Sequence, residues 1–357
     1  MNTQEIRQLL QNILAEPIRL SEKVLIYGAG NTAKLYAGCF EKESIPICGY
    51  VDRDPQKIGT LFQGKPVISV EKLCEDYKDN TVLVCSGNAA TCSEILEMLH
   101  EMHITCATVD AYVFRKNCDS VLAVYDMLCD TRSKEIYANL LLARMGIVPI
   151  DLTLVSDNAY FGINEFTQLS SFEVFVDCGA YVGDTLEQYL FQKSGVFDRI
   201  FAFEPELHNF RAMQYRIERL QKEWALADGK ITPVHAGVGE VTGKAYLSGG
   251  GSNTAASRDA IIQETGDNAV TIYALDDYFH DQRITFLKAD VESYEEKMLL
   301  GARHTITRDK PKIAVCIYHN ASDMYRIPLL IASICGDYHF AVRQHYGNLT
   351  DTVLYAY

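Results

Sequence analysis

The sequence predicts an α/β protein built from two doubly wound sheets that are joined by a helical linker. Apolar strand-like runs alternate with amphipathic helical runs in two separate stretches, and each stretch opens with a strand, a glycine-rich turn and a helix. This alternation is typical of parallel sheets that helices cover on both faces. Because 357 residues exceed what one core usually serves, we expect two domains over 1–118 and 151–357, with a linker over 119–150.

The first stretch is expected to begin with an amphipathic helix over residues 1–20. A buried strand, a glycine-rich turn and a helix are then predicted by KVLIYGAGNTAKLYAGCF. Further strands are predicted by ICGYVDRDP, by GKPVISVEKL, which also starts a helix, and by TVLVCSGN. A helix over 91–102 closes the series, so the first sheet should be parallel.

The first glycine-rich turn has the pattern G-x-G-x-x-A, and candidate nucleotide-binding residues are Gly28, Gly30, Asn31 and Asp52. In such turns, backbone amides at a helix N-terminus receive phosphate and an acidic residue after the second strand receives ribose. The stretch resembles the Rossmann-like N-terminal domain of sugar-modifying acyltransferases and the nucleotide-binding unit of sugar-nucleotide enzymes. This resemblance implies a UDP-sugar or similar ligand. The alternative is a unit kept for scaffolding or dimerisation, and no catalytic pair in residues 1–118 indicates a dehydrogenase.

Helical periodicity dominates residues 119–146 and predicts one or two linking helices. No Pro/Gly/Ser-rich linker separates the halves, so we expect them to be packed together. The second stretch predicts strands in FEVFVDCGA, RIFAFEPE, ITPVHAGVG, ITFLKADVE and KIAVCIYH. Helices should follow the first two of these strands. We expect a polar loop in AYLSGGGSNTAAS, a strand-like segment in VTIYALDDYF, and two late antiparallel strands around an NLTD turn at the end.

The second glycine-rich turn, in VFVDCGAYVGDT, has the form D-x-G-x-x-x-G-D. Gly179 and Gly183 let the backbone turn sharply and approach a ligand closely. Asp177 ends an apolar strand and should lie at the carboxyl edge of the sheet, where open α/β folds bind ligands. There it can hold an amino group directly or through water. S-adenosylmethionine carries an amine and a sulfonium centre but no phosphate, so an acidic turn suits this cofactor.

Two further segments complete the candidate cofactor site. Glu204 ends the next strand, where a carboxylate can accept both hydroxyls of a ribose. Ala236 and Gly237 follow the third strand and are placed to line an adenine. The full candidate set is Asp177, Gly179, Ala180, Tyr181, Gly183, Asp184, Glu204, Pro205, Ala236 and Gly237. The alternative is a generic nucleotide-binding turn or a plain tight turn, but the ordered set of three segments favours S-adenosylmethionine.

Residues 160–357 resemble the FkbM family of S-adenosylmethionine-dependent methyltransferases. The resemblance rests on the three cofactor segments, on FLKADVESYEEKMLLGA, and on PKIAVCIYHN, which contains His319. It implies a Rossmann-like class I methyltransferase fold and O-methylation, often of sugars in glycans or secondary metabolites. The sequence departs from the family pattern at Ser293, where the family commonly has glycine after Asp-Val-Glu. This difference changes the backbone freedom of the turn.

Candidate catalytic residues are Asp290, Glu292 and His319. Methyl transfer is an in-line displacement that depends on alignment, and a sugar hydroxyl needs a base to take its proton. Asp290 follows the strand ITFLKA, Glu292 is two residues on, and His319 ends KIAVCIYH. The alternatives are a cofactor-positioning role for Asp290 and a substrate-binding or structural role for His319. A divalent metal held by all three residues is an alternative that we do not favour.

Composition excludes several classes of protein. A net charge of −14 without a basic patch argues against a nucleic-acid partner. The eleven scattered cysteines form no C-x-x-C pair and suit a reducing cytoplasm better than disulfides or thiolate zinc sites. The N-terminus lacks the apolar core of a signal peptide, and no apolar run is long enough to span a bilayer. We therefore expect a cytoplasmic protein.

The leading hypothesis is an enzyme that O-methylates a small-molecule or glycan acceptor, such as a sugar or nucleotide-sugar. A non-catalytic regulatory module with two nucleotide pockets is the second hypothesis, and N- or carboxyl-methylation of a small molecule is the third. The loop GGGSNTAAS is expected either to close over substrate, with Ser252 and Asn253 donating hydrogen bonds, or to be an ordinary surface loop. The sequence leaves homo-oligomerisation open.

Overall fold

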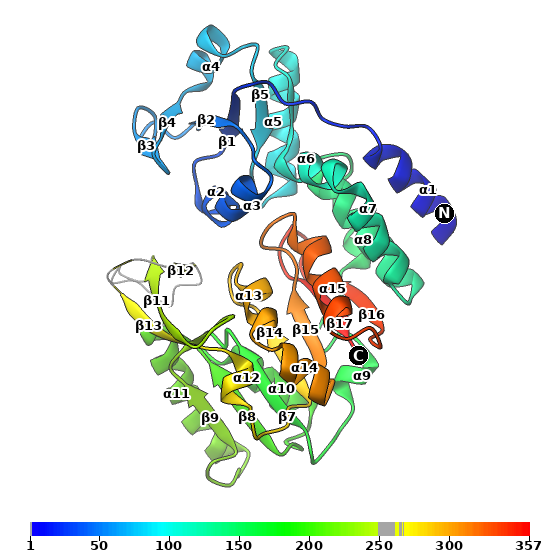
Figure 1. The fold of residues 1–357 in the computed structure, drawn as a ribbon, viewed down its shortest axis with the longest axis vertical. Coiled ribbons are helices and arrows are strands. Elements are labelled where there is room, and N and C mark those ends of the chain that lie inside the picture. The colour runs from blue at the N-terminus through cyan, green and yellow to red at the C-terminus, as the bar shows by residue number, and fades with distance from the viewer. Residues whose placement is uncertain (1, 249–260, 264–265, 267) are drawn as a thin grey trace. The chain divides into compact units, whose positions relative to one another are not determined.

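The chain divides into two compact units (Figure 1), and the computed structural model describes residues 2–248, 261–263, 266 and 268–357. The first unit comprises Met1–Val155, Tyr318–Tyr325 and Gln344–Thr352, and the second comprises Ser156–Ile317, Arg326–Arg343 and Val353–Tyr357. Each unit has its own mainly parallel sheet, which confirms the α/β class. The predicted linker helices group with the first unit, and the predicted domain boundaries stay predictions. No helix in the described ranges is both long and apolar enough to cross a membrane.

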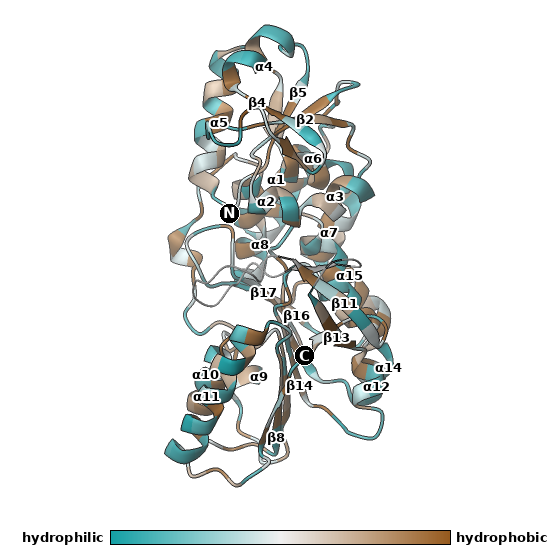
Figure 2. Cartoon of the chain, turned by 90° about the vertical axis from the view of Figure 1, so that its left-hand side faces the viewer, coloured by the Kyte–Doolittle hydropathy of each residue, from teal (hydrophilic) through white to brown (hydrophobic). Residues whose placement is uncertain are grey.

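The sheet of the first unit has the strand order of a doubly wound fold. Its strands, in order across the sheet, are β3 (Leu61–Phe62), β4 (Lys65–Ile68), β2 (Ile47–Val51), β1 (Val24–Tyr27), β5 (Thr81–Val84) and β6 (Cys106–Thr108). All neighbours pair in parallel except β3 and β4, which form an antiparallel edge. Every residue of the central strands β1 and β5 is buried, as expected where both faces are covered. Strands in both units are largely brown in Figure 2, while teal residues gather on helices and turns.

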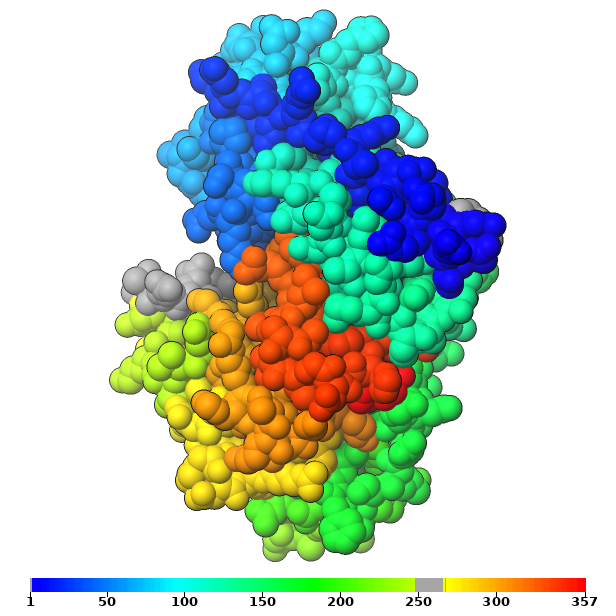
Figure 3. All heavy atoms as spheres, turned by 45° about the vertical axis from the view of Figure 1, so that its right-hand side comes forward, coloured from blue at the N-terminus to red at the C-terminus, as the bar shows by residue number. Residues whose placement is uncertain are grey.

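The first unit has eight α-helices within the residues that the structure describes. They are α1 (Thr3–Leu14), α2 (Asn31–Leu35), α3 (Ala37–Lys42), α4 (Val70–Asp76), α5 (Ala89–Glu101), α6 (Val109–Lys116), α7 (Cys118–Met127) and α8 (Thr131–Arg144), followed by the short 3-10 helix η1 (Leu152–Leu154). Helix α1 begins at a capping box formed by Asn2 and Glu5, and it is shorter than predicted. It packs against α6, α7 and α8, and Figure 3 shows it in blue over the cyan and green helices.

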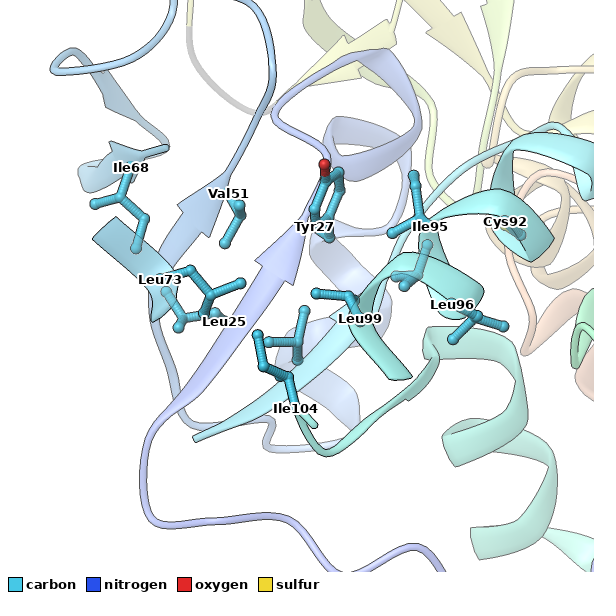
Figure 4. Packing of buried hydrophobic residues seen from close by; sticks show 12 residues of the cluster. Leu25, Tyr27, Val51, Ile68, Leu73, Cys92, Ile95, Leu96, Leu99 and Ile104 are labelled. Carbon is cyan, nitrogen blue, oxygen red and sulfur yellow. The ribbon is translucent and has the colours of Figure 1, made fainter. Parts of the chain in front are cut away.

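Helices α4 and α5 cover one face of the first sheet. Leu25 and Val51 from the strands pack against Ile95 and Leu99 from α5, and Leu73 from α4 joins the same cluster (Figure 4). Burying such a side chain contributes about 1.5–3 kcal/mol relative to leaving it exposed. The apolar runs and the helical spacing recognised in the sequence therefore meet in one core.

Arg144, at the end of α8, holds the two C-terminal segments that belong to the first unit. Its side chain is 3% exposed, pairs with Asp110 at 3.0 Å and donates to the Tyr36 hydroxyl at 3.1 Å. It also donates to the backbone carbonyls of Tyr318 at 2.6 Å and Leu349 at 2.9 Å. A buried guanidinium has to be paired and hydrogen-bonded to be tolerated. These bonds explain why segments so late in the chain belong to its first unit.

The sheet of the second unit has a reversal of strand order at its centre. Its strands, in order across the sheet, are β16 (Phe340–Gln344), β17 (Thr352–Ala356), β15 (Lys312–Cys316), β14 (Phe286–Ala289), β7 (Val174–Cys178), β8 (Arg199–Phe203) and β9 (Ile231–Val234). The run from β15 to β9 is parallel, and β17 is antiparallel to β15. The late antiparallel strand was predicted. The next strands in the chain, β8 and β9, lie on one side of β7, and the later strands β14 and β15 lie on its other side. The switch point therefore lies between β7 and β14.

Helices cover both faces of the second sheet. They are α9 (Asn164–Thr167), α10 (Asp184–Gln192), α11 (Leu207–Glu223), α12 (Leu275–Tyr278), α13 (Glu295–Leu300), α14 (Arg303–Asp309) and α15 (Asp323–Ile334). Figure 2 shows α10 and α11 on one side of the sheet and α12 and α14 on the other. This arrangement confirms the doubly wound architecture expected for the second stretch.

A small additional sheet was not predicted. Its described strands, in order, are β10 (Gly237–Val238), β13 (Ala269–Tyr273), β11 (Gly243–Ser248) and β12 (Ile261–Gln263). Ala245, Leu247, Val270 and Ile272 alternate along β11 and β13 and form its buried cluster. The strand-like segment VTIYALDDYF is a strand only in its first half, since α12 follows. Ser252 and Asn253 lie outside the described residues.

Candidate functional site

The candidate site is built at the carboxyl edge of the second sheet, between β7 and β14, which is where ligands bind in doubly wound folds. The turn after β7 touches the end of β14, because a Cβ added to Gly179 would overlap the carbonyl oxygen of Asp290. Gly179 also has φ +77°, a conformation that favours glycine. Gly183, with φ +79°, then starts α10. Both glycines of the predicted turn therefore have a physical reason to be glycine.

Glu204, directly after β8, is fixed beside this turn by backbone amides. Its Oε2 accepts from the amide of Tyr181 at 2.9 Å, and its Oε1 accepts from the amide of Glu206 at 2.9 Å and from Asn209 Nδ2 at 3.3 Å. Burial raises the pKa of Glu204 to about 7, although these hydrogen bonds oppose the shift. Each carboxylate oxygen has two lone pairs, so the group can still accept from a ligand. The structure thus brings two of the predicted segments together.

The remaining predicted cofactor residues lie around this pair. Tyr181 has φ +48° and is half-buried, and Asp184 is exposed as the first residue of α10. Ala180 and Ala236 are each 1% exposed, and Gly237 lies in β10. The carbonyl of Pro205 lies 3.1 Å from His235 Nε2, a contact that joins the second and third segments.

Asp177 is the penultimate residue of β7, and its carboxylate forms an ion pair. It is 0% exposed and its Oδ1 is 2.9 Å from Nζ of Lys288, which is 2% exposed in β14. Burial raises the pKa of Asp177 and the Lys288 ammonium opposes that shift. Burial alone would lower the pKa of Lys288, but the carboxylates of Asp177 and Asp290 hold that pKa above its ordinary value. A charged, buried ion pair therefore underlies the turn.

Sequence reasoning did not single out Lys288 or Tyr160. Lys288 Nζ also donates to the carbonyl of Gly179 at 2.8 Å, and it lies 4.9 Å from the centre of the Tyr160 ring. The Tyr160 hydroxyl donates to Asp290 Oδ2 at 2.8 Å and is 3.6 Å from the Cys316 thiol. A lysine inside the apolar run FLKA was a usable signal for Lys288, whereas nothing in the sequence marked Tyr160.

The turn after Asp290 is held in an unusual backbone conformation. Glu292 has φ +53° and Ser293 has φ +72°, so two consecutive residues other than glycine are left-handed. The amide of Val291 donates to Glu295 Oε1 at 2.9 Å, and Glu295 is 1% exposed. Ser293, the position where the sequence departs from the FkbM pattern, therefore takes a conformation that glycine adopts without strain.

His319 was predicted to end the strand KIAVCIYH, but it lies beyond the end of β15. The strand stops at Cys316, and His319 lies in the segment that groups with the first unit. It is 4% exposed, and its ring centroid is 4.2 Å from that of Tyr318. Asp290 and Glu292 belong to the second unit, so a common catalytic set with His319 stays a prediction.

The first glycine-rich turn is closed partly by its own acidic residue. Gly28 has φ +115°, and a Cβ there would lie 2.6 Å from the Cys85 carbonyl oxygen. Asp52 Oδ2 accepts from the amide of Ala29 at 3.0 Å and pairs with Lys57 at 3.0 Å. Partial burial works to raise the pKa of Asp52, but these hydrogen bonds and that of Asp54 outweigh it and lower the pKa.

The ends of this turn leave little helix for a phosphate. Gly30 is the N-cap residue of α2, and α2 is a short helix from Asn31 to Leu35. A role for Gly28, Gly30, Asn31 and Asp52 in nucleotide binding stays a prediction.

Comparison with known proteins decides the class of the second unit. Residues 177–345 match the family model described as the methyltransferase FkbM domain. Most of the second unit lies in the region that matches the FkbM methyltransferase domain. Residues 20–109 match the model described as C2185-like, N-terminal. No curated protein matches the chain.

A solved structure has a similar fold over almost the whole length of this chain. The crystal structure of methyltransferase FkbM from Methylobacillus flagellatus KT is similar over 99% of this chain and 98% of that chain, with a TM-score of 0.59 and 20% identity. UDP-D-quinovosamine 4-dehydrogenase from Vibrio fischeri is similar over 27% of this chain and 84% of its own, with 25% identity and a TM-score of 0.22. An rRNA methylase from Streptococcus thermophilus is similar over 53% of this chain and 87% of its own, with 14% identity and a TM-score of 0.32.

Proposed function

We propose that the FkbM domain binds S-adenosylmethionine at the Gly179 turn and methylates a hydroxyl group of a sugar, nucleotide-sugar or glycan. The observation that carries this proposal is the contact between the Gly179 turn and Asp290 at the switch point, with Glu204 fixed at the next strand. It brings a candidate cofactor turn and a candidate base onto adjacent strand ends.

The chemistry of the site suits this cofactor better than a phosphate ligand. Residues 177–184 include two acidic side chains and no basic one. The nearby cation, Lys288, is neutralised by Asp177. The cofactor's amine and sulfonium centre are favoured by a site without excess positive charge. Bound there, the cofactor supplies an electrophilic methyl group.

Each part of the chain has a distinct role in the proposal. Glu204 accepts from a ribose hydroxyl through Oε2, where the amide of Tyr181 leaves one lone pair open. Ala236 and Gly237 line the adenine on the side of β9. Asp290 is the preferred candidate for the base, because the Tyr160 hydroxyl orients its carboxylate. Glu292 and His319 remain candidates for the base or for binding the acceptor.

The acceptor class rests on the chemistry of the FkbM domain. A sugar hydroxyl would need a base of the kind that Asp290 offers. A divalent metal is a further ligand that Asp290 and Glu292 have the chemistry to bind, and it is not part of the proposal.

The cofactor proposal is tested by the shift in melting temperature that S-adenosylhomocysteine produces. Fluorescence of Trp224 follows the second unit, because it is the single tryptophan and lies at the end of α11. We expect the ligand to raise the transition temperature of the wild type and of Asp52→Ala, since a ligand that binds only the folded state stabilises it. Glu204→Ala should lose most of the shift. An equal shift in wild type and Glu204→Ala contradicts the proposed ribose contact.

The acceptor proposal is tested by a product assay. The chain is incubated with S-adenosylmethionine and a panel of free sugars, nucleotide-sugars and oligosaccharides, and products are identified by mass spectrometry. An ether-linked methyl group on a sugar supports O-methylation. A methylated amine or carboxylate overturns it in favour of the third hypothesis, and cofactor binding without turnover on any acceptor supports the regulatory module.

A further inference from the structure

A continuous set of contacts connects the Gly179 turn to Asp290 beneath the carboxyl edge of the sheet. Lys288 is at its centre: Nζ is 2.9 Å from Asp177 Oδ1 and 2.8 Å from the Gly179 carbonyl oxygen. The same ammonium lies 4.9 Å from the centre of the Tyr160 ring. Tyr160 then donates to Asp290 at 2.8 Å. All of these residues belong to the second unit.

The two carboxylates of this set, Asp177 and Asp290, differ in burial and in the charge of their partners. Asp177 and Lys288 are 0% and 2% exposed and neutralise each other inside the sheet. Asp290 is only half-buried, and the hydroxyl of Tyr160 adds no charge to it. Asp290 therefore places at this edge of the sheet a carboxylate that is less buried than Asp177.

Tyr160 has the features of a side chain held for a purpose. It is 7% exposed and has φ +65°, a backbone conformation that bulky residues rarely adopt. Such strain persists where the surrounding contacts determine the position, and it clusters at functional sites. The contacts here include the ammonium of Lys288 near the ring, the carboxylate of Asp290 on the hydroxyl, and the Cys316 thiol beside that hydroxyl.

We propose that Tyr160 and Lys288 are positioning residues. Tyr160 orients the Asp290 carboxylate, and Lys288 holds the Gly179 turn. Asp177 is the counter-ion of Lys288 rather than a ligand of the cofactor's amine. This inference rests on the proposed function, since it concerns how the same site meets S-adenosylmethionine. Asp177 then stabilises the interior of the sheet through its ion pair with Lys288, and it does not bind the cofactor.

The first test uses the charge of the cofactor. S-adenosylmethionine is a sulfonium cation and S-adenosylhomocysteine has a neutral thioether, so the ratio of their dissociation constants measures how the site treats positive charge. We expect Tyr160→Phe to shift this ratio against S-adenosylmethionine by about tenfold, because hydrogen bonds to charged groups are among the strong ones. A loss of overall stability alone leaves the ratio unchanged.

Tyr189→Phe is the matched control. Its hydroxyl donates to Glu173 Oε1 at 2.9 Å, so the substitution removes a buried tyrosine–carboxylate bond of the same kind in the same unit. Glu173 precedes β7 and is therefore at the opposite edge of the sheet. We expect the ratio of Tyr189→Phe to equal that of the wild type. An unchanged ratio in Tyr160→Phe overturns the inference for Tyr160.

The second test separates the two roles of Asp177. Methylthioadenosine lacks the amino-acid part of the cofactor but keeps its adenosine. If Asp177 acts through Lys288 and the turn, Asp177→Asn weakens S-adenosylhomocysteine and methylthioadenosine by the same factor. If it holds the amine, only S-adenosylhomocysteine is weakened, and the inference for Asp177 is wrong. A wild type that binds none of these ligands overturns the proposed function itself.

Discussion

Replacing Lys288 with methionine leaves Asp177 buried in β7 without the ammonium that neutralises it. The carboxylate is 0% exposed and its partner 2% exposed, so water cannot take over the role of the lysine. The group then escapes the cost of a buried charge by taking up a proton, as buried carboxyls do. The variant therefore exchanges an ion pair for a neutral acid.

The size of the effect follows from the cost of that proton. An unperturbed aspartate has a pKa of about 3.9 and each pH unit above it corresponds to about 1.4 kcal/mol, so protonation at pH 7 costs about 4 kcal/mol. Breaking a buried ion pair by removing one partner costs about 3–5 kcal/mol, which agrees. Because the folded variant binds a proton that the unfolded chain lacks, its deficit should grow by about 3 kcal/mol from pH 6 to pH 8.

Urea unfolding followed by Trp224 fluorescence measures this deficit in the second unit. Asp177→Asn combined with Lys288→Met removes both charges, and we expect it to recover at least about 2 kcal/mol of the loss and to abolish the added pH dependence. Lys310→Met is the control, because its ion pair with Asp337 is exposed and should contribute little to the free energy of unfolding. A Lys288→Met deficit as small as that of the control, or one independent of pH, refutes the reasoning.

Other substitutions test the turns and Glu204. Ser293→Gly should raise the free energy of unfolding by about 1 kcal/mol in the same urea assay, because Ser293 has φ +72°; a decrease would argue against strain there. Gly179→Ala should cost at least about 3 kcal/mol, because its Cβ overlaps the Asp290 carbonyl, whereas Gly229→Ala, with φ +78° and nothing within 4 Å, should cost only about 1 kcal/mol. Equal losses in these two variants exclude the overlap as the cause. Burial raises the pKa of Glu204 to about 7, above its unfolded value, so wild-type stability should fall as the pH rises from 5 to 8, by up to about 3 kcal/mol relative to Glu204→Gln. Parallel pH profiles for the two proteins in urea titrations would contradict the raised pKa.

The features that the sequence predicted well have local causes. Gly179 and Gly183 are required by positive φ angles in a turn directly after a buried strand, and Glu204 lies directly after the next strand. Parallel strands bring their carboxyl ends to one edge, so these residues could be placed together before the structure was known. The same reasoning placed Asp290 correctly at the end of β14.

The features that the sequence did not predict depend on contacts between distant residues. Tyr160 and Asp290 are 130 positions apart, and no periodicity or motif connects them. Asp177 was expected to face a ligand, but its partner Lys288 comes from a neighbouring strand that is far away in the chain. His319 was placed at the end of a strand that in fact stops at Cys316. Strand length and pairing across a sheet are set by tertiary packing, which local patterns do not encode.

The central claim, that the Gly179 turn rather than the Gly28 turn binds the methyl donor, is tested most directly by calorimetric titration of S-adenosylhomocysteine. The account predicts one site per chain in the wild type, unchanged affinity in Asp52→Ala, and a loss of about tenfold or more in Glu204→Ala, since a carboxylate that accepts ligand hydroxyls makes strong hydrogen bonds. No binding to the wild type, or a loss confined to Asp52→Ala, would contradict it.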